Sequence, residues 1–503
     1  MGRGVKSNKK QTSNAIDRRE MLKKTGLALT AAPFYFGLDS CVKAPKAPSF
    51  HADVLVLGAG LSGLNAALTL ENLGLNVKII EATDRFGGRV HTAKESDVPG
   101  HPELGANGIG GGYARLLDAA QKYGVEIGPY RPRTEPRKGE ILYAIKNNLI
   151  TPENWANHAA NPMPEAFRKG SPSSPAWSVY SQLNPLPKND LVAWRNPEYA
   201  KWDRSVYDIL KEKGFSEEAI QLTASTNSSY GADAKSISVL MYFQILNFIT
   251  QQAASAGKGG AAIGGNQRIP EAMANAFKQD ILLKSPVKGV VGEADGVSVT
   301  LENDKTLRAK YVLITLPASA LRRISLSPLP KGKQQKAFQE LSYTPCAQLH
   351  FVPTKKYWEE DGMPPSMWTD QLGGRFMALK NDPSDPDKVT SCVAYLNSNV
   401  AIAIDKMKRE DALEAVMKSL VTMRPSLKDA LQFVHYWTWI NNPYAGGAYA
   451  YWKPGQISEF ALDIAQPMGR VHFAGEHTAV LSRGMEGAME SGERAALEII
   501  NKI

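Results

Sequence analysis

The stretch that decides the fold reads HADVLVLGAGLSG and spans residues 51–63. Its apolar run, which ends at Leu57, is typical of a strand buried on both faces of a parallel sheet. A glycine turn follows at once, and a helical pattern then continues to Leu73. A second apolar run over residues 77–80 closes on Glu81. The order of these segments predicts a complete βαβ unit that binds a dinucleotide.

Each glycine of the turn has its own physical task. Gly58 permits the tight turn, Gly60 lets the backbone approach a pyrophosphate, and Gly63 allows the helix to pack closely on the strand. The N-terminus of the helix supplies N–H groups and the positive end of its dipole for the phosphates. Glu81 is placed to accept hydrogen bonds from a ribose diol. These features predict where the cofactor lies but leave its identity to the next segment.

The segment after the βαβ unit distinguishes FAD from NAD. Residues 81–90 read EATDRFGGRV, and the paired Gly87-Gly88 with Arg89 make a second loop that can lie against the pyrophosphate. An NAD unit would normally continue into another crossover helix instead. This pattern resembles the FAD signature of the superfamily of amine oxidases, phytoene desaturases and protoporphyrinogen oxidases.

The C-terminal end of the chain carries a second signature. Residues 469–476 (GRVHFAGE) predict a strand that leads to a turn of small residues. Residues 484–496 (GMEGAMESGERAA) predict a helix with small residues on one side, able to lie under a flavin. This segment is similar to the C-terminal signature of flavin amine oxidases, so the resemblance covers residue 50 to the end and is strongest at both termini.

The resemblance implies an α/β fold in which a Rossmann-type (GR2-like) FAD-binding domain is interleaved with an α+β substrate-binding domain. FAD-binding segments are expected at 51–124, 261–340 and 451–503, and substrate-binding segments at 125–260 and 341–450. The residues implied in cofactor binding are Gly58, Gly60, Ser62, Gly63, Glu81, Ala82, Gly88, Arg89, Gly105, Ala106, Val287, Gly475, Glu476 and Met485. Ala448 stands where monoamine oxidases carry the cysteine that bonds the flavin, so FAD is expected to be non-covalent.

Three residues are expected at the reacting end of the site. Tyr449 matches one wall of the family's aromatic cage, and Trp439, nine residues before Ala448, matches a tryptophan near the flavin ring. The second cage wall falls at Gly484, which would leave the cage half open. Gln348 stands where the family usually has a lysine that holds a water beside flavin N5. Glutamine can hold that water but supplies no charge, which favours an electron acceptor other than oxygen.

The resemblance implies oxidation of an amine to an imine by hydride transfer to flavin N5, followed by hydrolysis to an aldehyde or ketone. The electrons then pass to oxygen or to a protein acceptor. Two alternatives stay open on the residues alone: a carbon–carbon desaturase or porphyrinogen-type oxidase, and a non-catalytic FAD-binding protein. A homodimer is a further open possibility.

The first fifty residues predict export. Arg18-Arg19 precede a short apolar stretch, so residues 1–41 resemble a twin-arginine export signal, and residues 42–50 read as a linker. Residues 38–41 (LDSC) resemble a lipoprotein cleavage site with Cys41 as a lipid anchor, which predicts a periplasmic or membrane-anchored bacterial protein.

The charge and the cysteine content of the sequence argue against a nucleic-acid-binding protein and against a metal site. Residues 1–41 hold a net charge of +5, so only +4 of the total +9 remains, mixed in sign, and nucleic-acid binding has little support. No CxxC pair occurs, so zinc and dithiol motifs are absent and no metal is expected. A disulfide between Cys346 and Cys392 stays open.

Overall fold

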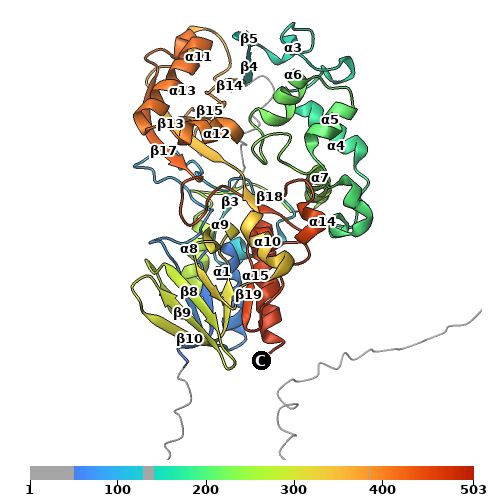
Figure 1. The fold of residues 1–503 in the computed structure, drawn as a ribbon. Helices are drawn as coiled ribbons and strands as arrows, with labels where there is room; N and C mark the ends of the chain where they lie inside the picture. Colours follow the sequence, from blue (N-terminus) through green and yellow to red (C-terminus); the bar gives the residue numbers. More distant parts are fainter. Residues whose placement is uncertain (1–49, 129–140, 256, 383) are drawn as a thin grey trace, which may run out of the picture. The chain divides into compact units, whose positions relative to one another are not determined.

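The computed structural model describes residues 50–128, 141–255, 257–382 and 384–503. The expected export signal, its Cys41 and the linker up to residue 49 lie outside these residues. Within residues 50–503 the chain builds two large sheets and the helices that cover them (Figure 1).

The first sheet is centred on β1 (Ala52–Leu57), the strand expected from the opening stretch. β1 lies between β10 (Thr306–Ile314) and β2 (Val77–Ile80), and it is parallel to both. Its side chains from Val54 onward are fully buried, which explains why the sequence shows a continuous apolar run rather than alternation. The sheet order is β11-β8-β9-β10-β1-β2-β7, and β19 pairs with β10. The further strands are β7 (Ile281–Leu282), β8 (Val287–Gly292), β9 (Val297–Leu301), β11 (Ser325–Ser327) and β19 (Val471–Phe473).

The two ends of the described chain meet on this sheet. Helix α1 (Leu61–Asn72) packs directly against α15 (Gly484–Ile500), and the two lie side by side in Figure 1. The contact depends on Gly492, because a Cβ at this position would lie 2.2 Å from the carbonyl oxygen of Ser62. The small residues that the sequence places on one side of α15 therefore serve close helix–helix packing.

The second sheet has the order β17-β13-β16-β15-β14-β4-β5. Neighbouring strands are antiparallel except β14 and β4, which are parallel. Its strands are β4 (Ile141–Ile145), β5 (Asn148–Ile150), β13 (Cys346–Pro353), β14 (Ser366–Thr369), β15 (Arg375–Leu379), β16 (Ser391–Asn397) and β17 (Leu431–Thr438). One face shares a core with α11 (Tyr357–Glu360), α12 (Ser398–Asp405) and α13 (Arg409–Met423).

The remaining helices lie on the first sheet or beside the second sheet. They are α2 (Ala114–Lys122), α3 (Pro152–Trp155), α4 (Ser174–Leu183), α5 (Val206–Glu212), α6 (Glu217–Ile220), α7 (Val239–Ala254), α8 (Arg268–Ala276), α9 (Ala318–Leu321), α10 (Gly332–Glu340) and α14 (Gln456–Phe460). Two short strand pairs complete the fold, β3 (Ile127–Gly128) with β6 (Ala261–Ala262) and β12 (Ser342–Tyr343) with β18 (Ala450–Tyr451). In the part of the chain that the structure describes, no helix combines the length and apolarity needed to cross a bilayer.

The aromatic segment 444–452 is extended over only a short stretch, because only Ala450–Tyr451 form a paired strand. The residues before them form a turn, because Gly446 and Gly447 have φ values of 67° and 144°, which a strand does not adopt.

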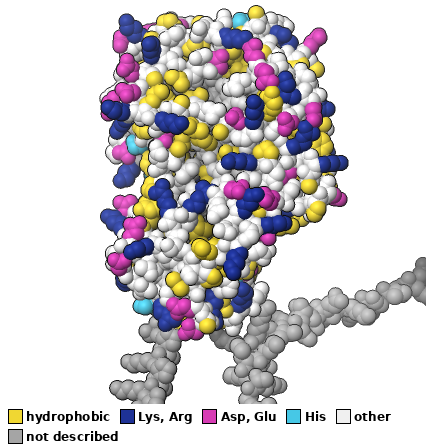
Figure 2. Space-filling model, viewed as in Figure 1, with side chains coloured by type: hydrophobic (Ala, Val, Ile, Leu, Met, Phe, Trp, Pro, Cys, Tyr) yellow, Lys and Arg dark blue, Asp and Glu magenta, His cyan; other side chains and the backbone are white. Residues whose placement is uncertain are grey.

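Two further observations concern chemistry that the sequence left open. Cys346 and Cys392 are both buried and do not form the disulfide that the sequence allowed. On the face shown in Figure 2, basic and acidic side chains are interspersed. No large region of one sign covers that face.

Candidate active site

A cavity of about 670 Å³ begins at the glycine turn after β1 and extends to the aromatic side chains beside the second sheet. Gly58 opens the turn with a φ of +105°. A Cβ on Gly63 would lie 2.0 Å from the Gly58 carbonyl oxygen, so α1 can approach β1 only because this residue is glycine. A Cβ on Gly60 would meet nothing nearer than 3.9 Å. The turn therefore has the close packing and the open backbone that a pyrophosphate requires.

Glu81 holds the far side of this turn in place. It is 8% exposed and lines the cavity just past β2. One carboxylate oxygen accepts the Ala59 N–H at 2.8 Å, and the other accepts the N–H and hydroxyl of Thr83 at 2.9 and 2.7 Å. The oxygen that accepts from Ala59 has a lone-pair position left for a hydrogen bond from a ligand such as a ribose diol.

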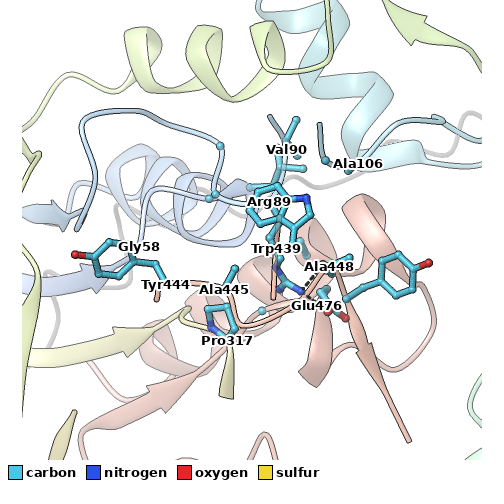
Figure 3. A pocket seen from close by; sticks show the side chains of 18 of the residues that line it. Gly58, Arg89, Val90, Ala106, Pro317, Trp439, Tyr444, Ala445, Ala448 and Glu476 are labelled. Carbon is cyan, nitrogen blue, oxygen red and sulfur yellow. Dashed lines mark hydrogen bonds and ion pairs between the residues drawn. The ribbon is translucent and has the colours of Figure 1, made fainter. Parts of the chain in front are cut away.

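An ion pair joins the N-terminal loop to the C-terminal turn across the cavity wall. Arg89 donates to Glu476 at 2.7 Å and to the carbonyl oxygen of Ala448 at 3.1 Å (Figure 3). Glu476 also accepts the backbone N–H of Ala450 at 2.7 Å. Burial alone would raise the pKa of Glu476, but Arg89, His477 and the Ala450 N–H together lower that pKa below its ordinary value. Glu476 is therefore ionised at neutral pH and fixes the loop that carries Arg89.

The aromatic end of the cavity contains Tyr449 and Trp439. The Tyr449 hydroxyl donates to the carbonyl oxygen of Ser229, and its ring centre lies 5.1 Å from that of Tyr230 at an interplanar angle of 58°. Trp439 is 2% exposed and donates from Nε1 to the Leu104 carbonyl oxygen at 2.7 Å. Burial raises the pKa of Tyr449 well above its ordinary value, so the phenol stays neutral.

Gln348 lies behind this wall and is not one of the described residues that line the cavity. Its amide nitrogen donates to the Leu104 carbonyl oxygen at 2.7 Å. Its amide oxygen lies 3.1 Å from Nε2 of His350, which is two residues further along β13 and therefore on the same face of the strand. The Leu104 carbonyl oxygen accepts hydrogen bonds from both Gln348 and Trp439. It therefore links the residue expected to hold a water beside flavin N5 to the tryptophan expected near the flavin ring.

The cavity brings together fifteen of the residues expected from the sequence, namely Gly58, Gly60, Ser62, Glu81, Ala82, Gly88, Arg89, Gly105, Ala106, Val287, Trp439, Tyr449, Gly475, Glu476 and Met485. Gly63 and Gln348 are the two that lie outside the lining, the first in the packing of α1 and the second behind Leu104. For all of these residues, inside and outside the lining, the roles toward cofactor and substrate stay predictions.

Sequence reasoning missed three polar or aromatic residues at the substrate end. Tyr230, Arg375 and Arg483 all line the cavity. Tyr230 and Arg375 come from segments with no recognisable motif. Arg483 immediately precedes Gly484 in the C-terminal signature, so its unusual charge at that place was a signal that could have been used.

Gly484, where the second cage wall is expected to be missing, has a φ of +57°. Among the described residues, a Cβ there would meet only the Tyr113 hydroxyl, at 3.9 Å. Tyr230 does not replace the missing wall, because its ring touches Tyr449 instead of facing it across a gap. Within the described residues, no cluster of three or more His, Cys, Asp or Glu side chains is arranged to hold a metal ion.

Comparison with known proteins places these features in a family. The family model for flavin containing amine oxidoreductases matches residues 61–500. Amine oxidase B of Cavia porcellus is 27% identical over 478 residues, which cover 90% of this chain and 86% of that protein. Amine oxidase B of Homo sapiens is 26% identical over 467 residues, 90% of this chain and 87% of that protein.

Solved structures share the fold. A putrescine oxidase variant with redesigned cofactor binding has a TM-score of 0.71 at 23% identity and covers 91% of this chain and 100% of its own. Cyclohexylamine oxidase from Brevibacterium oxydans has a TM-score of 0.72 at 23% identity and covers 90% of this chain and 99% of its own.

Proposed function

Because the chain belongs to the family of flavin containing amine oxidoreductases, we propose that its cavity oxidises a small-molecule amine at the carbon beside the nitrogen, with Tyr449 and Trp439 shaping the substrate end. Family membership makes the protein an FAD-dependent oxidoreductase that acts on amines. The observation that carries the proposal is the continuity of one cavity from the glycine turn to the aromatic side chains.

The cavity residues fit FAD. The glycine turn leaves the space above Gly60 open, and Glu81 offers carboxylate oxygens near it. Arg89 and the first turn of α15 at Met485 provide positive charge and N–H groups at the far end. Ala448 lines the cavity and has no nucleophile, which supports a non-covalent cofactor. The chemistry that FAD supplies when bound is two-electron acceptance from the carbon–hydrogen bond beside an amine.

The protein's own side chains act by orientation more than by proton transfer. Tyr449 stays neutral and is held by Ser229, so it presents a fixed ring face to the substrate. Among the described residues that line the cavity there is no histidine. The neutral form of the amine must therefore form in solvent or at the cavity mouth, and the aromatic wall then excludes water around it.

We expect anaerobic mixing of the purified FAD-loaded protein with a panel of amines to bleach the visible absorbance of the flavin with at least one amine. Bleaching reports the loss of two electrons from the substrate, and the aldehyde or ketone can be identified in the mixture. An alcohol and an alkene of matched shape serve as controls. Bleaching by the alkene alone would favour a carbon–carbon desaturase, and no bleaching by any compound would favour a non-catalytic flavoprotein.

Admitting air to the bleached protein identifies the class of electron acceptor. Slow return of colour is expected, because Gln348 places no charge beside the expected flavin position. Gln348→Lys retains a donor for the Leu104 carbonyl oxygen and adds a charge, so it should accelerate the return by about tenfold or more. Gln348→Met is the uncharged control. Fast return of the flavin colour in the unchanged protein would show that oxygen accepts the electrons even though position 348 has no lysine.

We also propose that residues 1–41 direct export, on the strength of Arg18-Arg19 and the apolar stretch behind them. The double replacement Arg18→Lys, Arg19→Lys keeps the charge and removes the paired arginines. Cell fractionation should find the unchanged protein in the periplasm or at the membrane and the double variant in the cytoplasm. Equal distribution of both would contradict the proposal.

A further inference from the structure

Arg483 is a cation in the wall of the substrate cavity, and the groups it is hydrogen-bonded to or packed against among the described residues are neutral. Its Nη1 donates to Gln244 at 3.3 Å and its Nη2 to the carbonyl oxygen of Ala450 at 3.2 Å. Its guanidinium carbon lies 5.7 Å from the ring centre of Tyr230. Among the described residues, no carboxylate oxygen lies within 4.0 Å of its nitrogens. An arginine has five N–H donors, so several remain for a ligand.

Arg483 contributes to the lowered pKa of Glu476, but none of the acidic side chains that line the cavity among the described residues forms an ion pair with it. In the described part of the chain these side chains are Glu81, Glu302 and Glu476. Glu81 is bonded to the glycine turn, and Glu302 follows β9 beside Val287 at the expected adenine end. Glu476 is already paired with Arg89. Among the described residues that line the substrate end, positive side chains therefore outnumber negative ones.

A second arginine faces the same end. Arg375 lines the cavity together with Tyr395 and Tyr449. Its guanidinium carbon lies 5.1 Å from the ring centre of Tyr395, and its Nη1 lies 3.5 Å from the Ser229 hydroxyl. Its Nη2 also donates to the Asn397 side chain, so Arg375 is held by other groups and the argument for a ligand contact rests on Arg483.

We propose that the amine substrate carries an anionic group, a carboxylate in the simplest case, and that Arg483 binds this group beside Tyr230 and Tyr449. The proposal rests on the proposed amine oxidation and specifies its substrate class. An arginine next to an aromatic wall suits a planar anion, because the guanidinium can donate two parallel hydrogen bonds to it. The same cation disfavours a diamine, whose second ammonium would meet a like charge.

The open side at Gly484 is consistent with this arrangement. The residue that would close the cage is replaced by glycine, and the residue before it is the arginine. At this side of the cavity, space and a positive charge stand where the resemblance places a second aromatic wall. A substrate with an anionic arm can occupy that space while its amine lies against Tyr449.

The test compares each of several amino acids with the amine left by its decarboxylation, by anaerobic bleaching of the FAD-loaded protein. Phenylalanine with phenethylamine and 4-aminobutanoate with propylamine are suitable pairs, and putrescine is the diamine. In the unchanged protein, the acid of at least one pair should saturate at a roughly 10- to 100-fold lower concentration than its amine, the range expected for a charge-assisted hydrogen bond. Putrescine should be the poorest substrate.

Arg483→Gln should bring the acid-to-amine ratio close to one by weakening the acids far more than the amines, whereas Arg483→Lys should retain part of the difference. Arg204→Gln is the matched control, because Arg204 is exposed and pairs with Glu212 outside the cavity. Benzoate gives a readout without turnover: it should perturb the flavin spectrum of the unchanged protein and of the control, but not of Arg483→Gln.

Three outcomes contradict the proposal in distinguishable ways. Equal saturation by acids and amines, unaffected by Arg483→Gln, shows amine oxidation without an anion site. A lower FAD content in Arg483→Gln with an unchanged acid-to-amine ratio shows that Arg483 serves the cofactor. No bleaching by any compound removes the proposed function, and absence of benzoate binding in that case removes the anion site as well.

Discussion

Replacing Gly63 with alanine should yield a protein that is purified with little or no FAD. The new Cβ would lie 2.0 Å from the Gly58 carbonyl oxygen and 3.0 Å from the Thr315 hydroxyl. The backbone at Gly58 cannot yield easily, since its φ of +105° already requires glycine. Helix α1 must therefore move away from β1, and its N-terminal N–H groups move with it. Losing one charge-assisted hydrogen bond to a phosphate weakens binding roughly 10- to 100-fold.

The measurement is the ratio of flavin to protein absorbance after purification and after dialysis against FAD. Gly74→Ala is the matched control at the other end of the same helix. Gly74 has a φ of +84° but nothing lies within 4 Å of a Cβ there, so alanine costs backbone strain of about 1–2 kcal/mol without moving α1. The control should keep its FAD. Normal FAD content in Gly63→Ala would show that the FAD site at the glycine turn tolerates displacement of α1.

Arg89→Met should destabilise the fold by about 3–5 kcal/mol, because it leaves Glu476 ionised and buried without its cation. The side chains of Arg89 and Glu476 are only 19% and 9% exposed, and their nitrogen and oxygen lie 2.7 Å apart. The pair joins two segments 387 residues apart in the chain, so its loss affects the cavity wall from both ends. Urea unfolding of the FAD-free protein measures the change.

The double variant Arg89→Met, Glu476→Gln distinguishes the effect of an unpaired Glu476 charge from the effect of a lost contact between Arg89 and FAD. Its stability should recover in part, because no unpaired charge remains, while FAD binding should stay weak if Arg89 contacts the cofactor. Full recovery of both stability and FAD binding would contradict a role of Arg89 in the cofactor site.

The stability deficit of Arg89→Met should also depend on pH. The folded pKa of Glu476 is lowered by its partners, so its contribution is present above the ordinary value of 4.5 and is lost as the pH falls through the folded pKa. The difference between the unchanged protein and Arg89→Met should therefore be largest near neutral pH and shrink below pH 4.5. A difference that does not change with pH would assign the effect to packing.

Much of the FAD site follows from local patterns in the sequence. The βαβ unit from Ala52 to Ile80 was predictable because a buried parallel strand, a glycine turn and a helix each leave a mark within a few residues. The shared strand face of Gln348 and His350 was predictable from the period of two. The open position at Gly484 needed only its place in the signature.

The substrate end depends on contacts between segments that lie far apart in the chain. No local pattern indicates that Tyr230 touches Tyr449, or that Leu104 accepts from both Gln348 and Trp439. The aromatic residues of segment 444–452 favour a strand, but two glycines with positive φ form a turn there. The backbone conformation of these glycines therefore outweighs the strand preference of the aromatic residues.

By itself the sequence determined the dinucleotide-binding unit, the choice of FAD and the substitutions at Ala448 and Gly484, because the glycine turn, its strand and its helix are encoded by neighbouring residues. Only the tertiary structure decided that Gln348 lies behind Leu104 and that Arg483 is a cation without an acidic partner among the described residues. The physical reason is that the surroundings of a side chain are set by long-range packing, which residue spacing does not encode.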